Sequence, residues 1–457
     1  MTDSFPSGFQ WGVATASYQI EGAAAEDGRA PSVWDAFARS PGRVLGGDTG
    51  DVACDHYHRY RDDVAIMASL GVRAYRFSIA WPRVLPRGHG AVNQRGLDFY
   101  RRLLDELGRH GITPRVTLYH WDHPQALEDE YGGWRSRRMA QDFADYVGVV
   151  VRELGDRVEH WTTLNEIACF THFSYDVGKP GFHAPGVALA SRKRVWQTSH
   201  HALLGHGLAV QAIRAHATRP CRVSLVDNLT VPVPVTESPT DVAAASRAFG
   251  AVGTNGGVLV PALTGRYEER FARAAEARGE LPDMEPEDLA TIAQPLDELG
   301  LNVYTGVYAR AAASDAGFEL LPFPGGYPKL DMPWLDVVPD ALYWAPRHCV
   351  EQLGFGGDFF VSENGCAARD ALTANGEVLD LDRIVYLRCY LRQLARAIAD
   401  GYRVRGYCLW SLLDNFEWAW GYAKRFGIVY VDYPTQRRIP KASARWYSEC
   451  VRQNRVV

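Results

Sequence analysis

Two glutamates at the ends of β-rich runs could serve as a pair of reacting carboxyl groups. Glu166 ends the run "VEHWTTLNE" (158–166), and Glu363 lies in "DFFVSENG" (358–365). Two carboxyl groups flanking a glycosidic bond can hydrolyse it, because one gives a proton to the leaving oxygen and the other meets the developing positive charge. A separation of about 5 to 5.5 Å gives retention of configuration, and roughly 6.5 to 9.5 Å gives inversion. The residue types predict the chemistry but leave its stereochemistry open.

Eight short runs rich in β-branched or aromatic residues recur along the chain, each followed by a segment with helical spacing. This alternation is typical of repeated βα units, and eight units close a barrel. We therefore predict a (β/α)8 TIM barrel in the α/β class, one domain over 1–457 with long βα loops. The runs are 9–15, 73–79, 114–120, 158–166, 222–227, 298–304, 358–365 and 404–414, and the long loops are 30–55, 171–190 and 311–340.

Polar side chains follow most of these runs, at the end of a barrel where active sites are built. Runs four and seven are expected to face each other across the barrel, so that Glu166 and Glu363 converge on one bond. A helix is predicted over 93–111, with Asn93 as a possible cap and Gly111 as its stop. The polar strand-end residues are Arg76, Ser78, His120, Trp121, Asn165, Asn302, Tyr304, Asn364, Trp410, Glu417 and Trp418.

Composition excludes several classes of function. A formal net charge of -5 provides no basic field for nucleic acid or an anionic membrane. We see neither a signal peptide in the first residues nor an apolar stretch of about 18 residues, so a cytoplasmic location is predicted. The eight cysteines are scattered, which argues against a disulfide framework or a zinc site. Structural roles are favoured for His56 and His58, and no metal or cofactor is expected.

Seven motifs together resemble glycoside hydrolase family 1, the retaining β-glucosidase family. They are "FQWGVATASYQIEGA", "YRFSIAWPR", "LYHWDHP", "TLNE", "LNVY", "SENG" and "WSLLDNFEWAWGYAKRFGIVYVDY", and the likeness covers nearly the whole chain. The resemblance implies that Glu166 is first a general acid and then a general base, and that Glu363 is the nucleophile. It further implies that Arg76 and Tyr304 hold Glu363 ionised and oriented.

The same resemblance implies a set of sugar-binding residues and a small-molecule β-glycoside substrate. Phosphosugar members carry Ser where this chain has Glu417, and Tyr where it has Phe426, although Lys424 is kept. A carboxylate at position 417 would repel a phosphate, which favours an unphosphorylated sugar. The implied sugar-binding residues are Gln19, His120, Trp121, Asn165, Asn302, Trp410, Glu417, Trp418 and Phe426, whereas Trp420 is assigned to the core.

One departure from the family pattern keeps other functions open. The family usually has Pro after the acid/base glutamate, and this chain has Ile167, which restores a backbone N–H. The loop behind it, "ACFTHFSYDVGKPGFHAPG", could shape an unusual acceptor site. Alternatives to hydrolysis of terminal β-glucosyl residues are therefore transglycosylation, a natural-product β-glycosidase, or a sugar-binding barrel without turnover. Glucose, galactose and fucose are not distinguished, and the oligomeric state is open.

Overall fold

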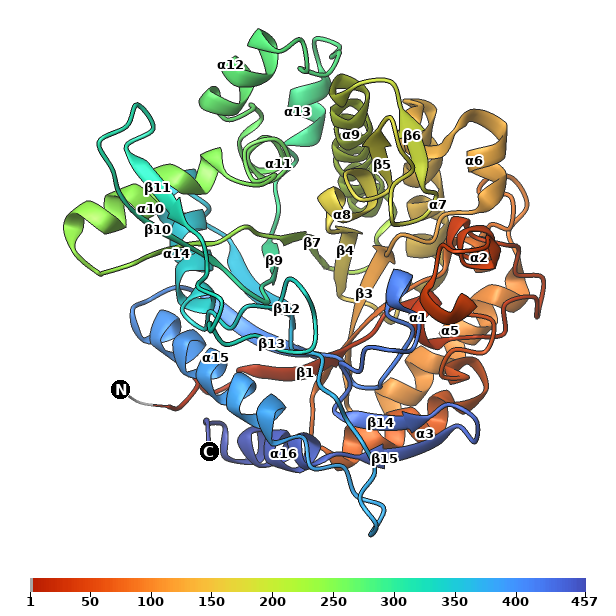
Figure 1. Cartoon of the computed structure of the whole chain (residues 1–457). Coiled ribbons are helices and arrows are strands. Elements are labelled where there is room, and N and C mark those ends of the chain that lie inside the picture. Colours follow the sequence, from red (N-terminus) through yellow and green to blue (C-terminus); the bar gives the residue numbers. More distant parts are fainter. Residues whose placement is uncertain (1–2) are drawn as a thin grey trace.

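A closed barrel of eight parallel strands forms the centre of the computed structural model, which describes residues 3–457 (Figure 1). Residues 1 and 2, which belong to the predicted domain and to the start searched for a signal peptide, lie outside the described residues. Each predicted run overlaps one barrel strand, so the predicted (β/α)8 barrel is confirmed. The strands are β1 (Gln10–Ala14), β2 (Ala74–Ser78), β3 (Thr113–Tyr119), β4 (His160–Asn165), β7 (Arg222–Asn228), β9 (Glu298–Asn302), β12 (Asp358–Asn364) and β13 (Val404–Trp410).

Helices surround the barrel and connect successive strands (Figure 1). The longer ones are α3 (His56–Ser69), α5 (Gln94–Arg109), α7 (Arg138–Leu154), α9 (Arg192–His216), α10 (Pro239–Ala251), α14 (Ala341–Leu353), α15 (Leu381–Ala399) and α16 (Ala442–Gln453). The shorter ones are α1 (Ser17–Ile20), α2 (Val33–Arg39), α4 (Trp81–Val84), α6 (Gln125–Tyr131), α8 (Ile167–Thr171), α11 (Leu259–Thr264), α12 (Glu269–Ala277) and α13 (Asp288–Ile292), with single 3₁₀ turns at Leu45–Gly47, Gly133–Arg135 and Trp418–Trp420. Within residues 3–457, no helix is long and apolar enough to cross a membrane.

Three small sheets lie outside the barrel and form part of its loops. The long loops predicted at 171–190 and 311–340 contain short strands of these sheets, and the loop at 30–55 contains α2. The extra strands are β5 (Tyr175–Val177), β6 (Val187–Leu189), β8 (Pro232–Pro234), β10 (Val307–Ala311), β11 (Phe318–Leu321), β14 (Val429–Asp432) and β15 (Arg437–Pro440).

The predicted helix after β2 is confirmed as α5, but its cap differs from the expectation. Asn93 occupies the N-cap position, yet its side-chain amide donates to the carbonyls of Asp27 (2.7 Å) and Arg83 (2.9 Å). The cap position therefore ties two preceding loops to the helix start. Gly111, the predicted stop, follows the helix with φ +64°, a conformation that glycine adopts without strain.

The order of strands around the barrel corrects the expectation that strands four and seven face each other. The order is β1-β13-β12-β9-β7-β4-β3-β2, so β4 and β12 are separated by two strands on one side and by four on the other. Directly opposite strands in an eight-stranded barrel are four positions apart, and these two are three apart. Glu166 and Glu363 still follow parallel strands and so share one rim of the barrel.

Irregular pairing occurs where the two glutamates are placed. The register between β4 and β7 shifts between Thr162 and Asn165, and that between β12 and β9 shifts between Val361 and Glu363. A β-bulge re-aims the side chains beyond it, and bulges are frequent beside active sites. The strand ends that carry Glu166 and Glu363 therefore depart from the regular alternation of the barrel wall.

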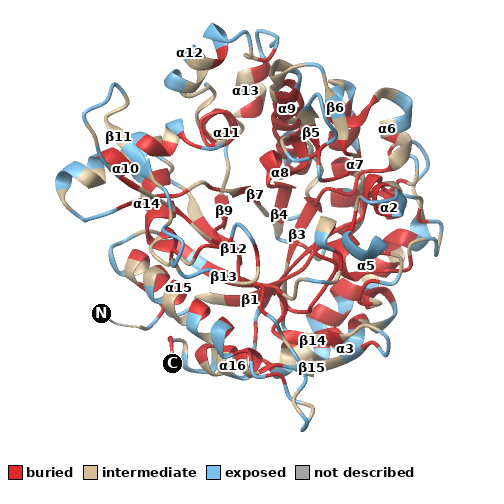
Figure 2. Cartoon of the chain, viewed as in Figure 1, coloured by how far each residue is buried: buried red, intermediate tan, exposed pale blue. Residues whose placement is uncertain are grey.

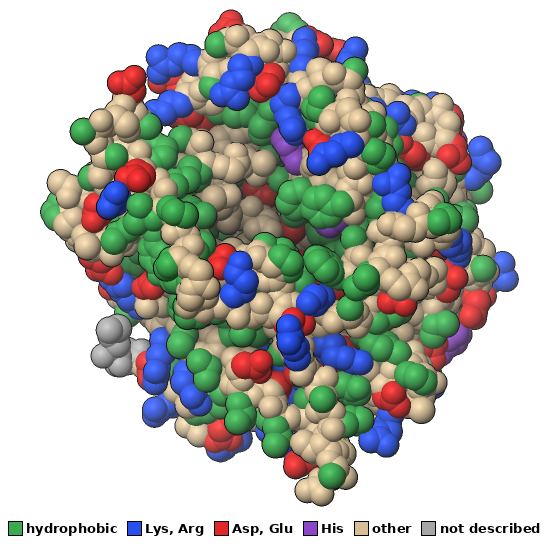
Figure 3. Space-filling model, viewed as in Figure 1, with side chains coloured by type: hydrophobic (Ala, Val, Ile, Leu, Met, Phe, Trp, Pro, Cys, Tyr) green, Lys and Arg blue, Asp and Glu red, His purple; other side chains and the backbone are tan. Residues whose placement is uncertain are grey.

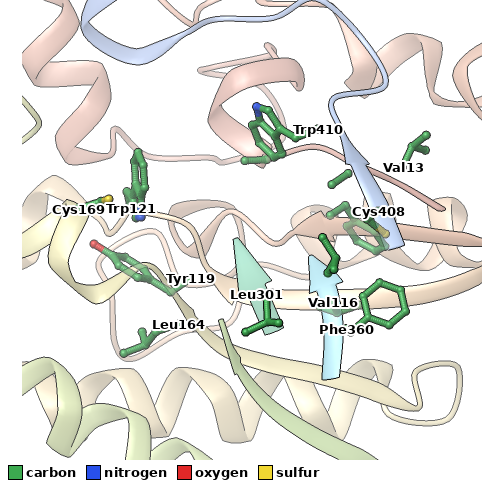
Figure 4. Close-up of a cluster of buried hydrophobic side chains, with 14 of the residues drawn as sticks. Val13, Val116, Tyr119, Trp121, Leu164, Cys169, Leu301, Phe360, Cys408 and Trp410 are labelled. Atoms are coloured by element: carbon green, nitrogen blue, oxygen red, sulfur yellow. The ribbon is translucent and has the colours of Figure 1, made fainter. Parts of the chain in front are cut away.

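The barrel strands are largely buried, and the surrounding helices have both buried and exposed residues (Figure 2). Figure 4 shows one buried cluster, which includes Val116, Leu164, Leu301 and Phe360 from four strands. The prediction that Trp420 is a core residue is wrong, because 37% of its surface is exposed. Its ring lies 5.5 Å from the ammonium group of Lys424.

Candidate active site

Glu363, at the end of β12, is buried and held by a cation and a phenol. A guanidinium N–H of Arg76 donates to its Oε1, and the hydroxyl of Tyr304 donates to its Oε2 at 2.7 Å. Hydrogen bonds and a positive charge directed at a carboxylate favour its ionised form. The structure therefore brings together the three residues whose contact the family resemblance implied, and it supplies the surroundings of an ionised nucleophile.

Arg76 is itself fixed by two further side chains, which point its guanidinium at Glu363. Its Nη2 donates to Oδ1 of Asn165 at 2.6 Å, and its Nε donates to the hydroxyl of Thr117 at 3.2 Å. Arg76 and Thr117 are buried inside the barrel on neighbouring strands β2 and β3. The sequence interpretation did not identify Thr117. The signal that could have identified it was its inward position on β3.

Glu166 is as buried as Glu363, with 4% of its surface exposed, but it has no salt bridge among residues 3–457. Its backbone N–H donates to the Val226 carbonyl on β7 (2.9 Å), and its Oε1 accepts from the Asn302 amide (2.6 Å). Burial and the negative charge of Glu363 together raise the pKa of Glu166 to about 7, although hydrogen bonds from Cys169 and Asn302 oppose this shift. A carboxyl group in this state holds a proton close to neutral pH.

The backbone of Glu166 has a left-handed conformation, with φ 53° and ψ 69°, directly before helix α8. Positive φ is uncommon for residues other than glycine and is found where function fixes the backbone. Ile167, the departure from the family pattern, is the first residue of α8. Proline is readily accommodated at that position because the first N–H of a helix has no partner within the helix.

A chain of hydrogen bonds joins the two glutamates. Asn302 donates to both Glu166 and Oδ1 of Asn165, and that Oδ1 also accepts from Arg76, which contacts Glu363. Ser362 donates to Oδ1 of Asn302 at 2.7 Å, which fixes the orientation of this amide. Asn302 and Asn165, expected as sugar ligands, thus also align the two carboxyl groups with each other.

Three buried polar side chains beside the glutamates have atoms without a hydrogen-bond partner among residues 3–457. Gln19 donates to Asn415 and to the Phe416 carbonyl, but its Oε1 is unpartnered, as is Oε2 of Glu417. His120 accepts from Asn165 at Nε2 (3.2 Å), and its Nδ1 is unpartnered. Unpaired buried polar atoms are costly, and their accumulation in one place indicates a polar ligand.

The charge states of His120 and Glu417 follow from their burial. Burial lowers the pKa of His120 well below its usual value, and the Arg76 cation adds to this, so the ring is neutral and its Nδ1 carries the proton. Burial and the charges of Glu363 and Glu166 together raise the pKa of Glu417 to about 8. The unpartnered atoms therefore include donors as well as acceptors, which suits hydroxyl groups.

Aromatic rings gather around these polar atoms. The His120 ring lies nearly parallel to both Trp410 and Trp418, with centroids 5.8 Å apart in each case. Trp121 lies 4.5 Å from Trp418, and its indole N–H donates to the Asn165 carbonyl at 2.8 Å. Phe426 is buried behind Tyr304, with ring centroids 6.2 Å apart. Figure 3 shows this face of the molecule hollowed near its middle, with hydrophobic side chains along much of the rim.

Lys424, the cation kept from phosphosugar relatives, is engaged elsewhere. Its ammonium group lies 3.0 Å from the carboxylate of Asp331. The histidines expected to be structural also have carboxylate partners, at 2.8 Å between His56 and Asp63 and at 2.6 Å between His58 and Asp55. Among residues 3–457, no group of three or more His, Cys, Asp or Glu side chains could hold a metal ion.

Two residues beside Glu166 were not assigned a catalytic role from the sequence, although Cys169 belongs to the loop expected to shape the acceptor site. Cys169, on α8, brings a buried thiol close to the Glu166 carboxyl group, and Asp227, on β7, places a further carboxyl group within electrostatic range of it. Cys169 lies three residues after Glu166, and Asp227 is the acidic residue that ends the run 222–227. The position of Asp227 at a strand end was the signal that could have identified it.

Known proteins resemble this chain in sequence and in structure. The family model described as Glycosyl hydrolase family 1 matches residues 1–456. Beta-glucosidase A of Acetivibrio thermocellus is 42% identical over 460 residues, which cover 99% of each chain. The thermostable beta-glucosidase B of Thermobispora bispora is 48% identical over 465 residues, covering 99% of this chain and 91% of that protein. A bifunctional beta-D-glucosidase/beta-D-fucosidase of Bifidobacterium breve is 43% identical over 468 residues, covering 98% of each chain.

Solved structures agree with the sequence matches. The family 1 β-glucosidase of Thermotoga maritima superposes with a TM-score of 0.88 at 41% identity, covering 100% of this chain and 99% of that one. The same enzyme in complex with deoxynojirimycin gives a TM-score of 0.88 at 41% identity and covers 100% of both chains. With the barrel, the two glutamates at its rim and these matches, the chain belongs to glycosyl hydrolase family 1 and is a glycoside hydrolase.

Proposed function

We propose that this enzyme hydrolyses terminal β-linked glucosyl residues, or closely related sugars, with retention of configuration. The observation that carries the proposal is the contrast between two buried glutamates at one rim. Glu363 receives donors from Arg76 and Tyr304, whereas Glu166 lies where burial raises its pKa to about 7. One carboxyl group is thus suited to be an ionised nucleophile and the other to be a proton donor.

In the first step, an oxygen of Glu363 attacks the anomeric carbon of the sugar. The bond from that carbon to the glycosidic oxygen breaks, and the proton of Glu166 moves to this oxygen, so that the aglycone leaves as an alcohol. The sugar is now an ester of Glu363. Because the ester carries no charge, the negative charge that had raised the pKa of Glu166 is gone, and Glu166 remains ionised.

In the second step, Glu166 acts as the base. It takes a proton from a water molecule whose oxygen attacks the anomeric carbon, and the bond to Glu363 breaks. The sugar leaves with its original configuration, and both carboxyl groups return to their starting states. Asn302 and Asn165 support both steps, because they align the two carboxyl groups through the hydrogen bonds that join them.

The unpartnered atoms of Gln19, His120 and Glu417 are proposed to bind the hydroxyl groups of an unphosphorylated sugar. The rings of Trp410 and Trp418 provide the apolar faces on which a pyranose packs. The Lys424–Asp331 pair and the carboxyl group of Glu417 argue against a phosphate ligand. Relatives whose names include β-glucosidase and β-fucosidase support glucose and fucose as the first sugars to test.

A cytoplasmic location is proposed as well. All eight cysteines are free thiols, six of them buried, which suits a reducing compartment. The oligomeric state is left open.

The experiment that tests the proposal is the hydrolysis of a panel of nitrophenyl β-glycosides, with the first sugar product observed by NMR. We expect release of nitrophenol from the β-glucoside and appearance of the β-anomer before the α-anomer. The ester can be trapped by reaction with a slowly hydrolysed substrate. Mass spectrometry that finds a sugar covalently attached to the peptide containing Glu363 would support it. First appearance of the α-anomer would overturn the two-step mechanism, and turnover of none of the glycosides would favour a binding protein.

A further inference from the structure

A third carboxyl group, not used in the proposed mechanism, is buried beside Glu166. Asp227 has 1% of its surface exposed. Neither of its carboxyl oxygens has a hydrogen-bond partner among residues 3–457. Other buried carboxylates of this chain do have partners, as Glu363 has Arg76 and Asp63 has His56. A buried carboxyl group that keeps neither a cation nor a donor is costly in its ionised form.

The backbone places Asp227 directly against the acid/base residue. The preceding carbonyl, that of Val226, accepts the N–H of Glu166, and the following residue, Asn228, pairs in register with Asn302, whose amide donates to Glu166. Asp227 itself pairs with the buried Leu301 on β9. Glu166 is therefore held by β7, the strand that carries Asp227, and by Asn302 on the neighbouring strand β9.

The titratable groups that face Asp227 come from three elements. They are Glu166 at the end of β4, the thiol of Cys169 on α8 and the thiol of Cys349 on α14. Burial and the charge of Glu166 together raise the pKa of Asp227 to about 8, although the backbone N–H of Asn228 opposes this shift. Burial also keeps both thiols protonated, so Glu166 is the charged group in this set that affects Asp227 near neutral pH.

We propose that Asp227 is a positioning residue for the glycosidase reaction, a buried carboxyl group that holds a proton and whose charge state is linked to that of Glu166. The linkage is reciprocal: if ionised Glu166 makes Asp227 hold its proton more tightly, ionised Asp227 does the same to Glu166. At alkaline pH, Asp227 therefore keeps part of the Glu166 population protonated. The inference rests on the proposed role of Glu166 as the general acid.

The linkage has a defined consequence for the pH profile. In the wild-type enzyme, two coupled ionisations shape the alkaline decline of kcat/KM, so the decline is broad. In Asp227→Asn, which keeps the shape of the side chain without its ionisation, a single ionisation remains. The decline becomes steeper, and its midpoint moves to lower pH by up to about one unit.

The test measures kcat/KM from pH 5 to 10 for the wild type, Asp227→Asn and Asp227→Leu with an alkyl β-glucoside, whose leaving group needs a proton. Asp340→Asn is the matched control, because burial also raises the pKa of Asp340, but it lies at the start of α14 and the charges that act on it are those of Arg396 and Glu237 rather than that of Glu166. Thermal unfolding of each variant reports whether it is folded. We expect both Asp227 variants to show the shifted, steeper decline and the control to show the wild-type profile.

Two results would overturn the inference. One is an unchanged alkaline decline in folded Asp227→Asn and Asp227→Leu. The other is a loss of kcat/KM by the same factor at every pH, which is what a purely structural role produces. Glu166→Gln, assayed with the same alkyl glucoside, separates this failure from that of the proposed function. If that variant keeps wild-type activity, Glu166 is not the acid and both proposals fail. If it loses activity while Asp227→Asn keeps the wild-type profile, only the inference about Asp227 fails.

Discussion

Glu363 and Glu166 are the same amino acid at the same rim of the same barrel, yet their surroundings are opposite. A cation and a phenol contact Glu363, whereas an amide, a thiol and a second buried carboxyl group lie beside Glu166. Both side chains are 4% exposed, so the amount of burial does not distinguish them. The identity of the neighbours determines which carboxyl group is ionised and which holds a proton.

The contrast depends on where each neighbour comes from. Arg76 reaches Glu363 from β2, and Tyr304 reaches it from the segment after β9. The neighbours of Glu166 come from the two strands that follow β4 on one side of the barrel, Asp227 from β7 and Asn302 from β9. Asn165 connects the two carboxyl groups, because its Oδ1 accepts from Arg76 and from Asn302. Variants that change the surroundings of one glutamate should therefore affect one chemical step more than the other. The largest loss is expected at the nucleophile itself and the smallest at the residue that follows the acid.

Glu363→Gln should have the largest effect, because it removes the proposed nucleophile and leaves its two donors without a charged acceptor. We expect kcat to fall by about 10⁴-fold or more for every β-glycoside, in the range seen when a covalent catalyst is removed. The measurement is the steady-state release of nitrophenol. Glu276→Gln, a change at an exposed carboxylate on α12, is the control and should retain activity. A Glu363→Gln enzyme with more than a few per cent of wild-type activity would contradict the proposed ester.

Glu166→Gln should have an effect that depends on the leaving group. For an alkyl glucoside we expect a loss of about 10² to 10⁴-fold in kcat/KM, whereas a dinitrophenyl glucoside, which leaves without a proton, should form the ester at nearly the wild-type rate. Azide, which needs no base, should then restore turnover and give a β-glycosyl azide. An equal loss for both substrates would show that Glu166 has no role as an acid.

The same substitution tests the pH dependence. Because burial raises the pKa of Glu166 to about 7, the wild type holds the needed proton below that pH and loses it above, so kcat/KM for alkyl glucosides should fall as pH rises through about 7. The alkaline decline should be absent from the ester-forming step of Glu166→Gln with the dinitrophenyl substrate. Persistence of the decline in that variant would assign it to another group.

Tyr304→Phe should have an intermediate effect. It removes the 2.7 Å hydrogen bond to Glu363 but leaves Arg76 in place. A hydrogen bond to a charged group contributes about 1.5 to 3 kcal/mol, so kcat should fall by roughly 10- to 100-fold. Tyr327→Phe, which removes a phenol bonded at 2.9 Å to the Val337 carbonyl, is the control. The loss in Tyr304→Phe should be the same for alkyl and dinitrophenyl glucosides, in contrast to Glu166→Gln.

Ile167→Pro should have the smallest effect, although it restores the residue usual in the family. Ile167 is the first residue of α8, where the lost N–H has no partner within the helix. The contacts of the Glu166 side chain with Asn302 and Cys169 are unchanged by the substitution. We expect kcat/KM within about threefold of the wild type. A tenfold change in either direction would show that the residue after Glu166 controls the position of the acid.

Part of this arrangement could be predicted from the sequence. The eight strands were found because buried parallel strands are short runs of β-branched and aromatic residues, and their ends carry the polar groups of the site. The residues assigned from family motifs lie together at one rim, and Glu363 contacts the two side chains expected to hold it. The prediction for Trp420 was wrong because aromatic character alone does not show which face of a loop is covered.

Other features needed the tertiary structure. The offset between β4 and β12 follows from the closed order of the strands, and the bulges beside Thr162 and Val361 follow from pairing between strands far apart in the chain. The role of Asn302 as a link between Glu166 and Asn165 depends on three side chains from two strand ends meeting at hydrogen-bond distance. None of these contacts is encoded by local spacing.

The sequence by itself determined the barrel, the pair of glutamates and the aromatic, polar site around them, because strand periodicity and residue type are local properties. Only the tertiary structure decided the protonation states on which the chemistry depends. A carboxyl group titrates according to its burial and to charges that arrive from distant parts of the chain, such as that of Glu363 at Glu166 and that of Glu166 at Asp227. Identical side chains therefore take different roles when folding gives them different neighbours.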